Sequence, residues 1–219
     1  MGEVIRLAER RVARASAARP RPGSAPVVFH FDLSCPFSYL TAESVERLLP
    51  RAWWRPTIGA PASADLKSIA RLRDAAERRA EELRLPLVWP ARHPLPVRSG
   101  MRAALRATWQ GHGSAFALAA ARLAFCGGFD LDDPEVLAEA AAAAGLGLPE
   151  VMAAAGDRSR DGEMEATALR LLAHGADRLP VLKVGRTLFC GEHRIAEAAA
   201  AVRHRPGVRR AQTQVHNAG

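Results

Sequence analysis

A cysteine at a strand–helix junction is the residue of this chain best placed to do chemistry. Cys35 lies in the run FDLSCPFSYL, between an apolar stretch at 27–33 and a helical pattern at 37–49. Unpaired backbone N–H groups and the macrodipole at a helix start favour a thiolate. Pro36 suits the first helical position because it has no N–H to leave unpaired. The sequence therefore predicts a reactive Cys35 thiol with a lowered pKa.

The residue three positions further on decides what kind of thiol chemistry is open to Cys35. A redox dithiol carries a second cysteine at that place, and this chain has Ser38 there. A serine cannot resolve a mixed disulfide, but it can donate a hydrogen bond to a thiolate one helical turn away. Ser38 is therefore the second predicted catalytic residue. Cys126 and Cys190 lie in apolar segments typical of small buried side chains, and Cys190 is the internal candidate for resolving a disulfide.

Composition restricts the class of protein. The chain has 219 residues, of which 48% are hydrophobic, enough for one large domain or a small domain with an insertion. Its net charge of +8 belongs to the two ends, residues 1–25 and 203–219, because basic and acidic residues cancel between them. No aromatic residue is interleaved with the arginines of these ends. The pattern favours solvated tails over a nucleic-acid site.

The absence of long apolar segments and the spacing of the cysteines predict where the protein is located and whether it binds a metal. No apolar run approaches the length of about 18 residues that a membrane span requires. Residues 1–26 contain no apolar signal segment, and three distant cysteines do not make a disulfide framework. We therefore expect a cytoplasmic protein. Cys190 and His193 have a zinc-ligand spacing without a second pair, so no metal is predicted.

The order of predicted elements indicates the fold. Apolar runs and helical periodicity predict strands at 27–33 and 52–57 with a helix at 37–49 between them. Helices follow at about 65–83, 99–110, 114–126, 134–144, 148–156 and 161–174; then come a hairpin of strands 179–184 and 187–190 and a helix to about 202. A short amphipathic helix is also expected at 3–15.

This order is that of a thioredoxin-like α/β sheet (β-α-β … β-β-α) with a large all-helical insertion. We expect a basic N-terminal segment at residues 1–25 and a basic C-terminal tail at residues 203–219. Between them, residues 26–60 and 175–202 form a thioredoxin-like domain, and residues 61–174 form a helical insertion domain.

Three motifs carry a resemblance to a known family. The run at 31–40, the segment Trp54-Arg55-Pro56 and the Leu179-Pro180 hairpin resemble those of 2-hydroxychromene-2-carboxylate isomerases and kappa-class glutathione transferases. These proteins are members of the DsbA-like thioredoxin superfamily. The resemblance spans about residues 26–202 and implies a cytoplasmic homodimeric enzyme that uses glutathione and a small-molecule substrate.

The resemblance also implies roles for particular residues. The position of Cys35 is usually a serine in this family, where it hydrogen-bonds the glutathione thiolate, and a cysteine in the redox relatives. Pro180 matches a cis proline, and the backbone of Leu179 matches the group that pairs with the main chain of glutathione. The family has a motif, Gly-x-Asp-Arg, that holds the glutamyl end of glutathione. In this chain the motif is matched by Gly191, Glu192, His193 and Arg194, and His193 replaces the aspartate. The asparagine expected in the 94–99 loop is absent, and Arg98 and Ser99 are the candidates to replace it.

Three functions remain open at this point. The first is a glutathione-dependent isomerase or transferase acting on an aromatic-derived molecule. The second is a monothiol thiol–disulfide oxidoreductase, and the third is a binding module without catalysis. The aromatic side chains that can line a substrate pocket are Phe37, Tyr39, Trp53, Trp54 and Trp89.

Overall fold

The sheet at the centre of the molecule has four strands. The computed structural model describes residues 27–59 and 66–204. Its strands are β1 (Val27–Phe31), β2 (Trp53–Pro56), β3 (Val181–Val184) and β4 (Thr187–Cys190), in the spatial order β2-β1-β3-β4. β1 is parallel to β2 and antiparallel to β3, and β3 and β4 form a hairpin in which Val184 is paired with Thr187. The predicted thioredoxin-like sheet is confirmed.

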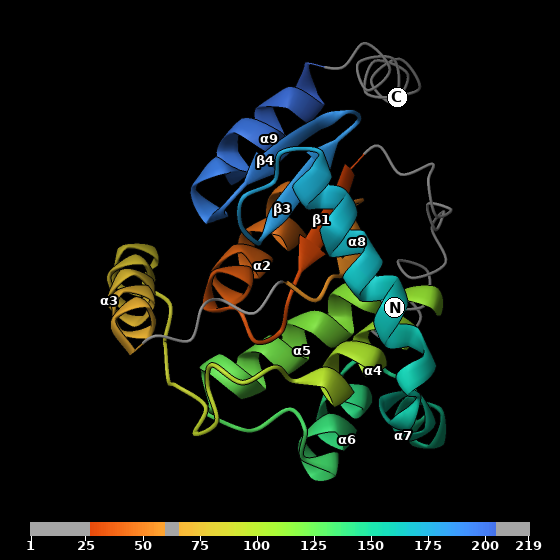
Figure 1. Cartoon of the computed structure of the whole chain (residues 1–219). Helices are drawn as coiled ribbons and strands as arrows, with labels where there is room; N and C mark the ends of the chain where they lie inside the picture. The colour runs from red at the N-terminus through yellow and green to blue at the C-terminus, as the bar shows by residue number, and fades with distance from the viewer. Residues whose placement is uncertain (1–26, 60–65, 205–219) are drawn as a thin grey trace, which may run out of the picture.

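Helices fill the long connection between β2 and β3. α2 (Pro36–Leu48) joins β1 to β2, and α9 (Ile195–Arg203) follows the short 3-10 turn η2 (Glu192–Arg194) after β4. The insertion consists of α3 (Leu66–Leu83), α4 (Arg98–Trp109), α5 (Gly113–Phe125), α6 (Pro134–Ala143), α7 (Leu148–Gly156), η1 (Arg158–Arg160) and α8 (Asp161–Ala173). In Figure 1, α4 to α7 gather beyond one end of the sheet, and α8 returns across it. The helix expected at 3–15, the basic N-terminal segment and residues 205–219 of the expected C-terminal tail lie outside the described residues, and Arg203 of that tail is the last residue of α9.

The alternation of side chains along the strands gives the sheet two different faces. Phe29 pairs in register with Leu182, which pairs with Phe189, and all three point into the main core. Val181 pairs with Cys190, and both belong to a smaller cluster that includes Leu171 of α8. Successive residues of a strand point to opposite faces. One face therefore meets the main core and the other meets α8.

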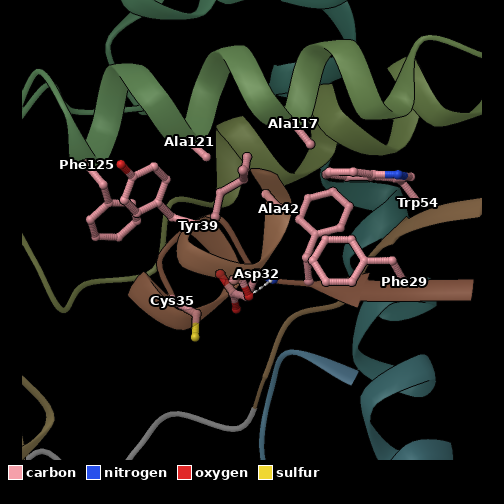
Figure 2. A pocket seen from close by; sticks show the side chains of 12 residues that line it. Phe29, Asp32, Cys35, Tyr39, Ala42, Trp54, Ala117, Ala121 and Phe125 are labelled. Carbon is pink, nitrogen blue, oxygen red and sulfur yellow. Dashed lines mark hydrogen bonds between the residues drawn. The ribbon is translucent and has the colours of Figure 1, made fainter. Parts of the chain in front are cut away.

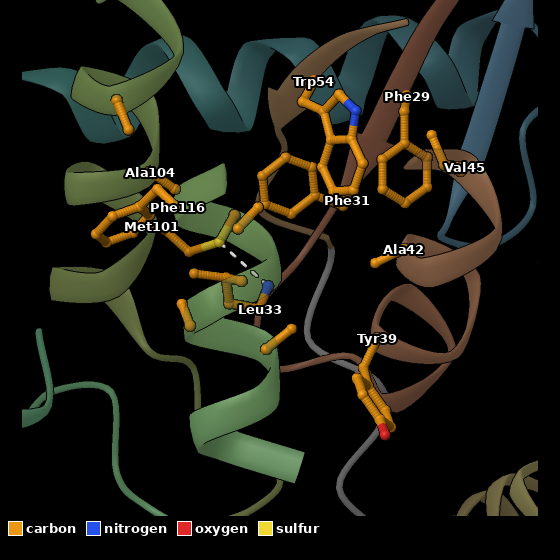
Figure 3. Close-up of a cluster of buried hydrophobic side chains, with 14 of the residues drawn as sticks. Phe29, Phe31, Leu33, Tyr39, Ala42, Val45, Trp54, Met101, Ala104 and Phe116 are labelled. Carbon is orange, nitrogen blue, oxygen red and sulfur yellow. Dashed lines mark hydrogen bonds between the residues drawn. The ribbon is translucent and has the colours of Figure 1, made fainter. Parts of the chain in front are cut away.

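The insertion shares the main core with the sheet. Trp54 of β2 lies edge-on to Phe29, with 4.8 Å between the ring centroids, and its main-chain oxygen accepts a hydrogen bond from Thr108 Oγ1 of α4 at 3.0 Å. Met101 of α4 and Phe116 of α5 belong to the same cluster (Figure 3). Fully burying a large apolar side chain contributes about 1.5–3 kcal/mol, so this shared core holds the insertion against β1 and β2, the strands on either side of Cys35 in the chain.

A buried ion pair fastens α4 to the start of α8. Arg102 is 8% exposed, and its Nε and Nη2 donate to the two carboxylate oxygens of Asp161 at 2.7 and 2.6 Å. Its Nη1 donates to the carbonyl oxygen of Ala155 at 3.1 Å. The hydrogen bond from Arg102 lowers the pKa of Asp161. Asp161 thus stabilises the fold as a carboxylate.

We expect Asp161→Asn to destabilise the protein by about 3 kcal/mol at neutral pH, because it leaves the charge of Arg102 buried without a partner. The native pKa of Asp161 lies below its ordinary value of 3.8. The contribution of Asp161 to the free energy of unfolding is therefore complete above pH 3.8 and is lost as the pH falls through the native pKa. Urea unfolding of the wild type and the variant should show a difference in the free energy of unfolding that becomes smaller below about pH 4.

The control is Asp177→Asn, which removes the exposed carboxylate paired with Arg178 and should change the free energy of unfolding by less than about 1 kcal/mol. Equal effects of the two substitutions would contradict the role given to the buried pair.

Candidate active site

Cys35 occupies the N-cap position of α2, as the sequence predicts. Its backbone is extended (φ −94°, ψ 115°), and Pro36 follows as the first helical residue. The Cys35 N–H donates to the Asp32 carbonyl oxygen at 3.1 Å, and the Cys35 carbonyl accepts the N–H of Ser38 at 3.0 Å. These two bonds close a tight turn between β1 and α2. The turn places the half-buried thiol at the start of the helix.

Asp32 is a buried acid in this turn that the sequence reasoning missed. Its Oδ1 accepts the Ser34 N–H at 2.8 Å and the Ser34 hydroxyl at 2.7 Å, and its Oδ2 accepts the Gly59 N–H at 3.2 Å. Burial nevertheless raises the pKa of the Asp32 carboxyl. Figure 2 shows it beside Cys35. An acid directly after a buried strand and three residues before the cysteine was the available signal.

Ser38 lies one helical turn after Cys35 and is buried. Its Oγ accepts the N–H of Asp32 at 3.1 Å, so this hydroxyl holds the turn in shape. Its hydroxyl and its N–H both act to lower the pKa of the Cys35 thiol. The structure thus brings the two predicted catalytic residues together, with Asp32 between them in the same network.

The predicted lowering of the Cys35 pKa is wrong. The pKa of this thiol is raised to about 11, chiefly because burial disfavours the thiolate. The charge of Asp32 also raises it, and hydrogen bonds from Ser38 and Phe37 oppose the rise. Removal of water disfavours the thiolate, and here it outweighs the N–H groups of one helical turn. At neutral pH Cys35 is a protonated thiol that can donate a hydrogen bond.

The loop before β3 lies against this thiol. The Leu179–Pro180 peptide bond is cis, and the Cys35 Sγ is 3.9 Å from the carbonyl oxygen of Leu179. The carbonyl of Pro180 accepts the Gly191 N–H at 2.8 Å. Gly191 leads into η2, so a track of backbone groups that contact one another runs from Cys35 past Leu179 and Pro180 to Glu192, His193 and Arg194.

Those three residues have partners of their own. Glu192 Oε1 is 3.5 Å from Nε of Arg79 on α3, and Glu192 Oε2 is 3.7 Å from Nδ1 of the exposed His193. Arg194 pairs with Glu197 at 2.6 Å and lies over the Phe189 ring at 5.5 Å. Arg194 therefore makes a salt bridge in the first turn of α9. Arg79, which no sequence motif singled out, is the residue that α3 contributes beside Glu192.

Two of the aromatic side chains proposed for a substrate pocket are structural. Tyr39 donates its hydroxyl to the Pro86 carbonyl at 2.7 Å and stacks on Phe125 with 5.6 Å between centroids. Tyr39 and the core residue Trp54 line a small internal cavity together with Asp32 and Cys35 (Figure 2). That cavity is part of the core and not an open binding cleft.

The remaining three are half-buried. Trp89 donates its Nε1–H to Glu77 at 2.7 Å, and Trp53 lies 6.4 Å from the Trp109 ring. Phe37 is half-buried and packs against the main core.

The other two cysteines are free thiols in different surroundings. Cys126 Sγ lies 3.2 Å from the Tyr39 hydroxyl. Cys190 packs with Leu171 and Leu179 in the cluster on the α8 face of the sheet. Residues 27–59 and 66–204 contain no group of three or more His, Cys, Asp or Glu side chains arranged to hold a metal ion. No helix within those residues is long and apolar enough to cross a membrane.

Comparisons with known proteins agree with this architecture. The family model of the DSBA-like thioredoxin domain matches residues 26–202. No curated protein sequence matches the chain. The structure is similar to that of a 2-hydroxychromene-2-carboxylate isomerase, with a TM-score of 0.66 and 18% identity, covering 88% of this chain and 99% of that one.

Two oxidoreductase structures are also similar. The cytosolic disulfide reductase DsbM from Pseudomonas aeruginosa, solved with glutathione, has a TM-score of 0.60 and 18% identity, covering 81% of this chain and 96% of that one. A probable DsbA oxidoreductase from Streptomyces coelicolor has a TM-score of 0.60 and 20% identity, covering 80% of this chain and 87% of that one. At these identities the likeness establishes the fold that surrounds Cys35.

The pKa of Cys35 can be measured in a variant that keeps this thiol alone, made by Cys126→Ser and Cys190→Ser. We expect its iodoacetamide alkylation rate to rise with pH toward a midpoint of about 11, because burial disfavours the thiolate. At pH 8 alkylation should be slower than that of a free cysteine. A midpoint below that of free cysteine would contradict this assignment.

Replacing Asp32 tests the electrostatic part of the shift. We expect Asp32→Asn, in the same single-cysteine background, to lower the alkylation midpoint, because it removes a negative charge that raises the Cys35 pKa. Ser34→Ala is the matched control: it removes one hydrogen bond to Asp32 and leaves the charge in place. An unchanged midpoint in Asp32→Asn would show that burial alone sets the pKa.

Proposed function

Because the chain belongs to the DSBA-like thioredoxin domain family, we propose that it is a glutathione-dependent isomerase or transferase of the 2-hydroxychromene-2-carboxylate isomerase type, acting on an aromatic-derived small molecule. The observation that carries this proposal is the Cys35 thiol at the start of α2, which faces the carbonyl oxygen of Leu179 beside the cis Pro180. A thiol whose pKa is raised to about 11 is a poor nucleophile at neutral pH but a hydrogen-bond donor. That is the role in which a serine at the same position would serve.

In this reaction the attacking atom belongs to glutathione. Its thiolate forms a carbon–sulfur bond to an unsaturated carbon of the substrate, and the electron pair of the double bond moves to a conjugated carbonyl oxygen. The former double bond is now single and rotates. Return of the electron pair re-forms the double bond and expels the thiolate, so no oxidant or reductant is consumed. The S–H of Cys35 steadies the thiolate before attack and after departure.

The track from Cys35 to η2 supports glutathione as the bound thiol. The main chain of Leu179, beside Pro180, would pair with the cysteinyl unit. Glu192, His193 and Arg194 would meet the glutamyl end, which carries both an ammonium and a carboxylate. Glu192 and its neighbour Arg79 present one charge of each sign, which suits such a zwitterion. The glutathione in the DsbM structure supports the same choice. We propose as well the cytoplasmic location and the homodimer that the family resemblance implies.

A second candidate function, monothiol disulfide oxidoreductase, is favoured by Asp32. A buried carboxyl with a raised pKa near the thiol can accept its proton. The Cys35 thiolate would then attack a disulfide between glutathione and a second thiol, bond to the glutathione sulfur and release the second thiol. A further glutathione thiolate would attack that mixed disulfide, giving oxidised glutathione and restoring Cys35.

Two substitutions at Cys35 separate these functions. Cys35→Ser keeps a hydrogen-bond donor, so we expect it to retain glutathione-dependent isomerisation of an aromatic unsaturated keto acid. Cys35→Ala removes the donor and should lower kcat about 10²-fold, in line with the loss of one donor to a reacting anion. The measurements are isomerisation kinetics, a disulfide-reduction assay with glutathione, and calorimetric titration with glutathione.

The other outcomes are equally informative. Disulfide reduction that both variants abolish, without isomerisation, would replace the proposal with the oxidoreductase. Glutathione binding without either activity would indicate the binding module. Absence of binding at millimolar glutathione, together with absence of activity, would overturn the proposal.

A further inference from the structure

A methionine from the insertion makes direct contact with the backbone of the Cys35 turn. The N–H of Leu33 points at Met101 Sδ of α4, 3.3 Å away (Figure 3). Both residues are in the main core, with Leu33 4% and Met101 1% exposed. The sulfur is therefore an acceptor for a backbone N–H to which water has no access.

The N–H groups of residues 32–35 show why this contact matters. Asp32 donates to Ser38 Oγ, Ser34 to Asp32 Oδ1, and Cys35 to the Asp32 carbonyl. These three partners come from the turn itself or from the first turn of α2. The partner of the fourth N–H, that of Leu33, comes from α4, 68 residues further along the chain. A buried N–H without a partner is costly, so the position of α4 helps to determine the shape of the turn.

The first turn of α4 packs closely against its neighbours in the core. A Cβ added at Gly100 would lie 3.2 Å from the Leu131 Cβ and 3.6 Å from the Leu33 Cδ1. The contact with Leu131 is tight and that with Leu33 is an ordinary van der Waals distance, so glycine lets the start of α4 come close to Leu131. The N–H of Ser99 donates to Asp132 Oδ1 at 3.0 Å, which fixes the first turn of α4 independently of the cysteine.

We propose that Met101 is a positioning residue for Cys35: its thioether holds the Leu33 N–H and thereby keeps the turn closed around the thiol. When the acceptor is removed, the Leu33 N–H must find another partner. Asp32 is the acceptor nearest along the chain, and water is the alternative once the turn opens. Either change loosens the packing that shields Cys35. This inference rests on the proposed function only in taking Cys35 as the working thiol.

The test replaces the sulfur without changing the volume greatly. Met101→Leu keeps a side chain of similar size but offers no acceptor. Met164→Leu is the matched control, because Met164 is also 1% exposed but lies on α8. In the single-cysteine background, we expect Met101→Leu to lower the Cys35 alkylation midpoint by about one pH unit, a tenfold rate increase below the midpoint. Met164→Leu should leave the midpoint unchanged.

Two further variants keep the inference open to refutation. Met101→Gln supplies an amide oxygen as acceptor at similar length and should return the midpoint toward the wild-type value. If Met101→Leu does not fold, as judged by circular dichroism, Gly100→Ala takes its place, because an added Cβ presses against Leu131 and shifts the first turn of α4, which carries Met101. Its midpoint should also fall.

Equal midpoints in Met101→Leu, Met164→Leu and the single-cysteine parent would overturn the inference and leave Met101 a packing residue. So would an unchanged midpoint in a folded Gly100→Ala, should that variant be needed. The proposed function is judged separately by isomerisation and disulfide reduction in the wild type. A shifted midpoint in an inactive protein would reject the function alone, and an unshifted midpoint in an active protein would reject the positioning role alone.

Discussion

The turn that carries Cys35 is buried, so every N–H in it needs a partner inside the protein. This requirement links parts of the chain that are far apart. Ser38 of α2 and Met101 of α4 each supply an acceptor, and the Asp32 carboxylate supplies another. The helical insertion is therefore part of the turn's construction and not an appendage to the sheet. The common core of Trp54, Thr108 and their neighbours keeps α4 at the distance this arrangement needs.

The same burial determines the electrostatics of the turn. A helix N-terminus stabilises a thiolate, but removal of water disfavours one, and the nearby carboxylate of Asp32 adds to that penalty. The result is a Cys35 pKa raised to about 11 and a raised pKa for Asp32. A protonated thiol facing the Leu179 carbonyl is suited to donating a hydrogen bond. The balance between burial and helix start thus supports the hydrogen-bonding role that we propose for Cys35.

The two faces of the sheet place Cys190 and its neighbour Phe189 in different clusters. Phe29, Leu182 and Phe189 point into the main core, whereas Val181 and Cys190 point toward α8. Because neighbouring residues of a strand alternate between faces, Cys190 cannot change face without a shift in register. Cys126 meets the Tyr39 hydroxyl at the other end of the first turns of α2. Ser38 occupies the position at which a redox dithiol carries its second cysteine, and Cys35, Cys126 and Cys190 are all free thiols.

The sequence by itself determined the order and type of the elements, and the bounds of strands and helices agree with the expected ranges to within a few residues. Periods of two and of about 3.6 residues, Pro36 at a helix start and the Gly185-Arg186 turn are local signals, and they place Cys35 at its junction. Only the tertiary structure decided the contact of Met101 with Leu33, the pairing of Arg79 with Glu192 and the direction of the Cys35 pKa shift. Those depend on which distant side chains meet and on how much water they displace, and no spacing along the chain encodes either quantity.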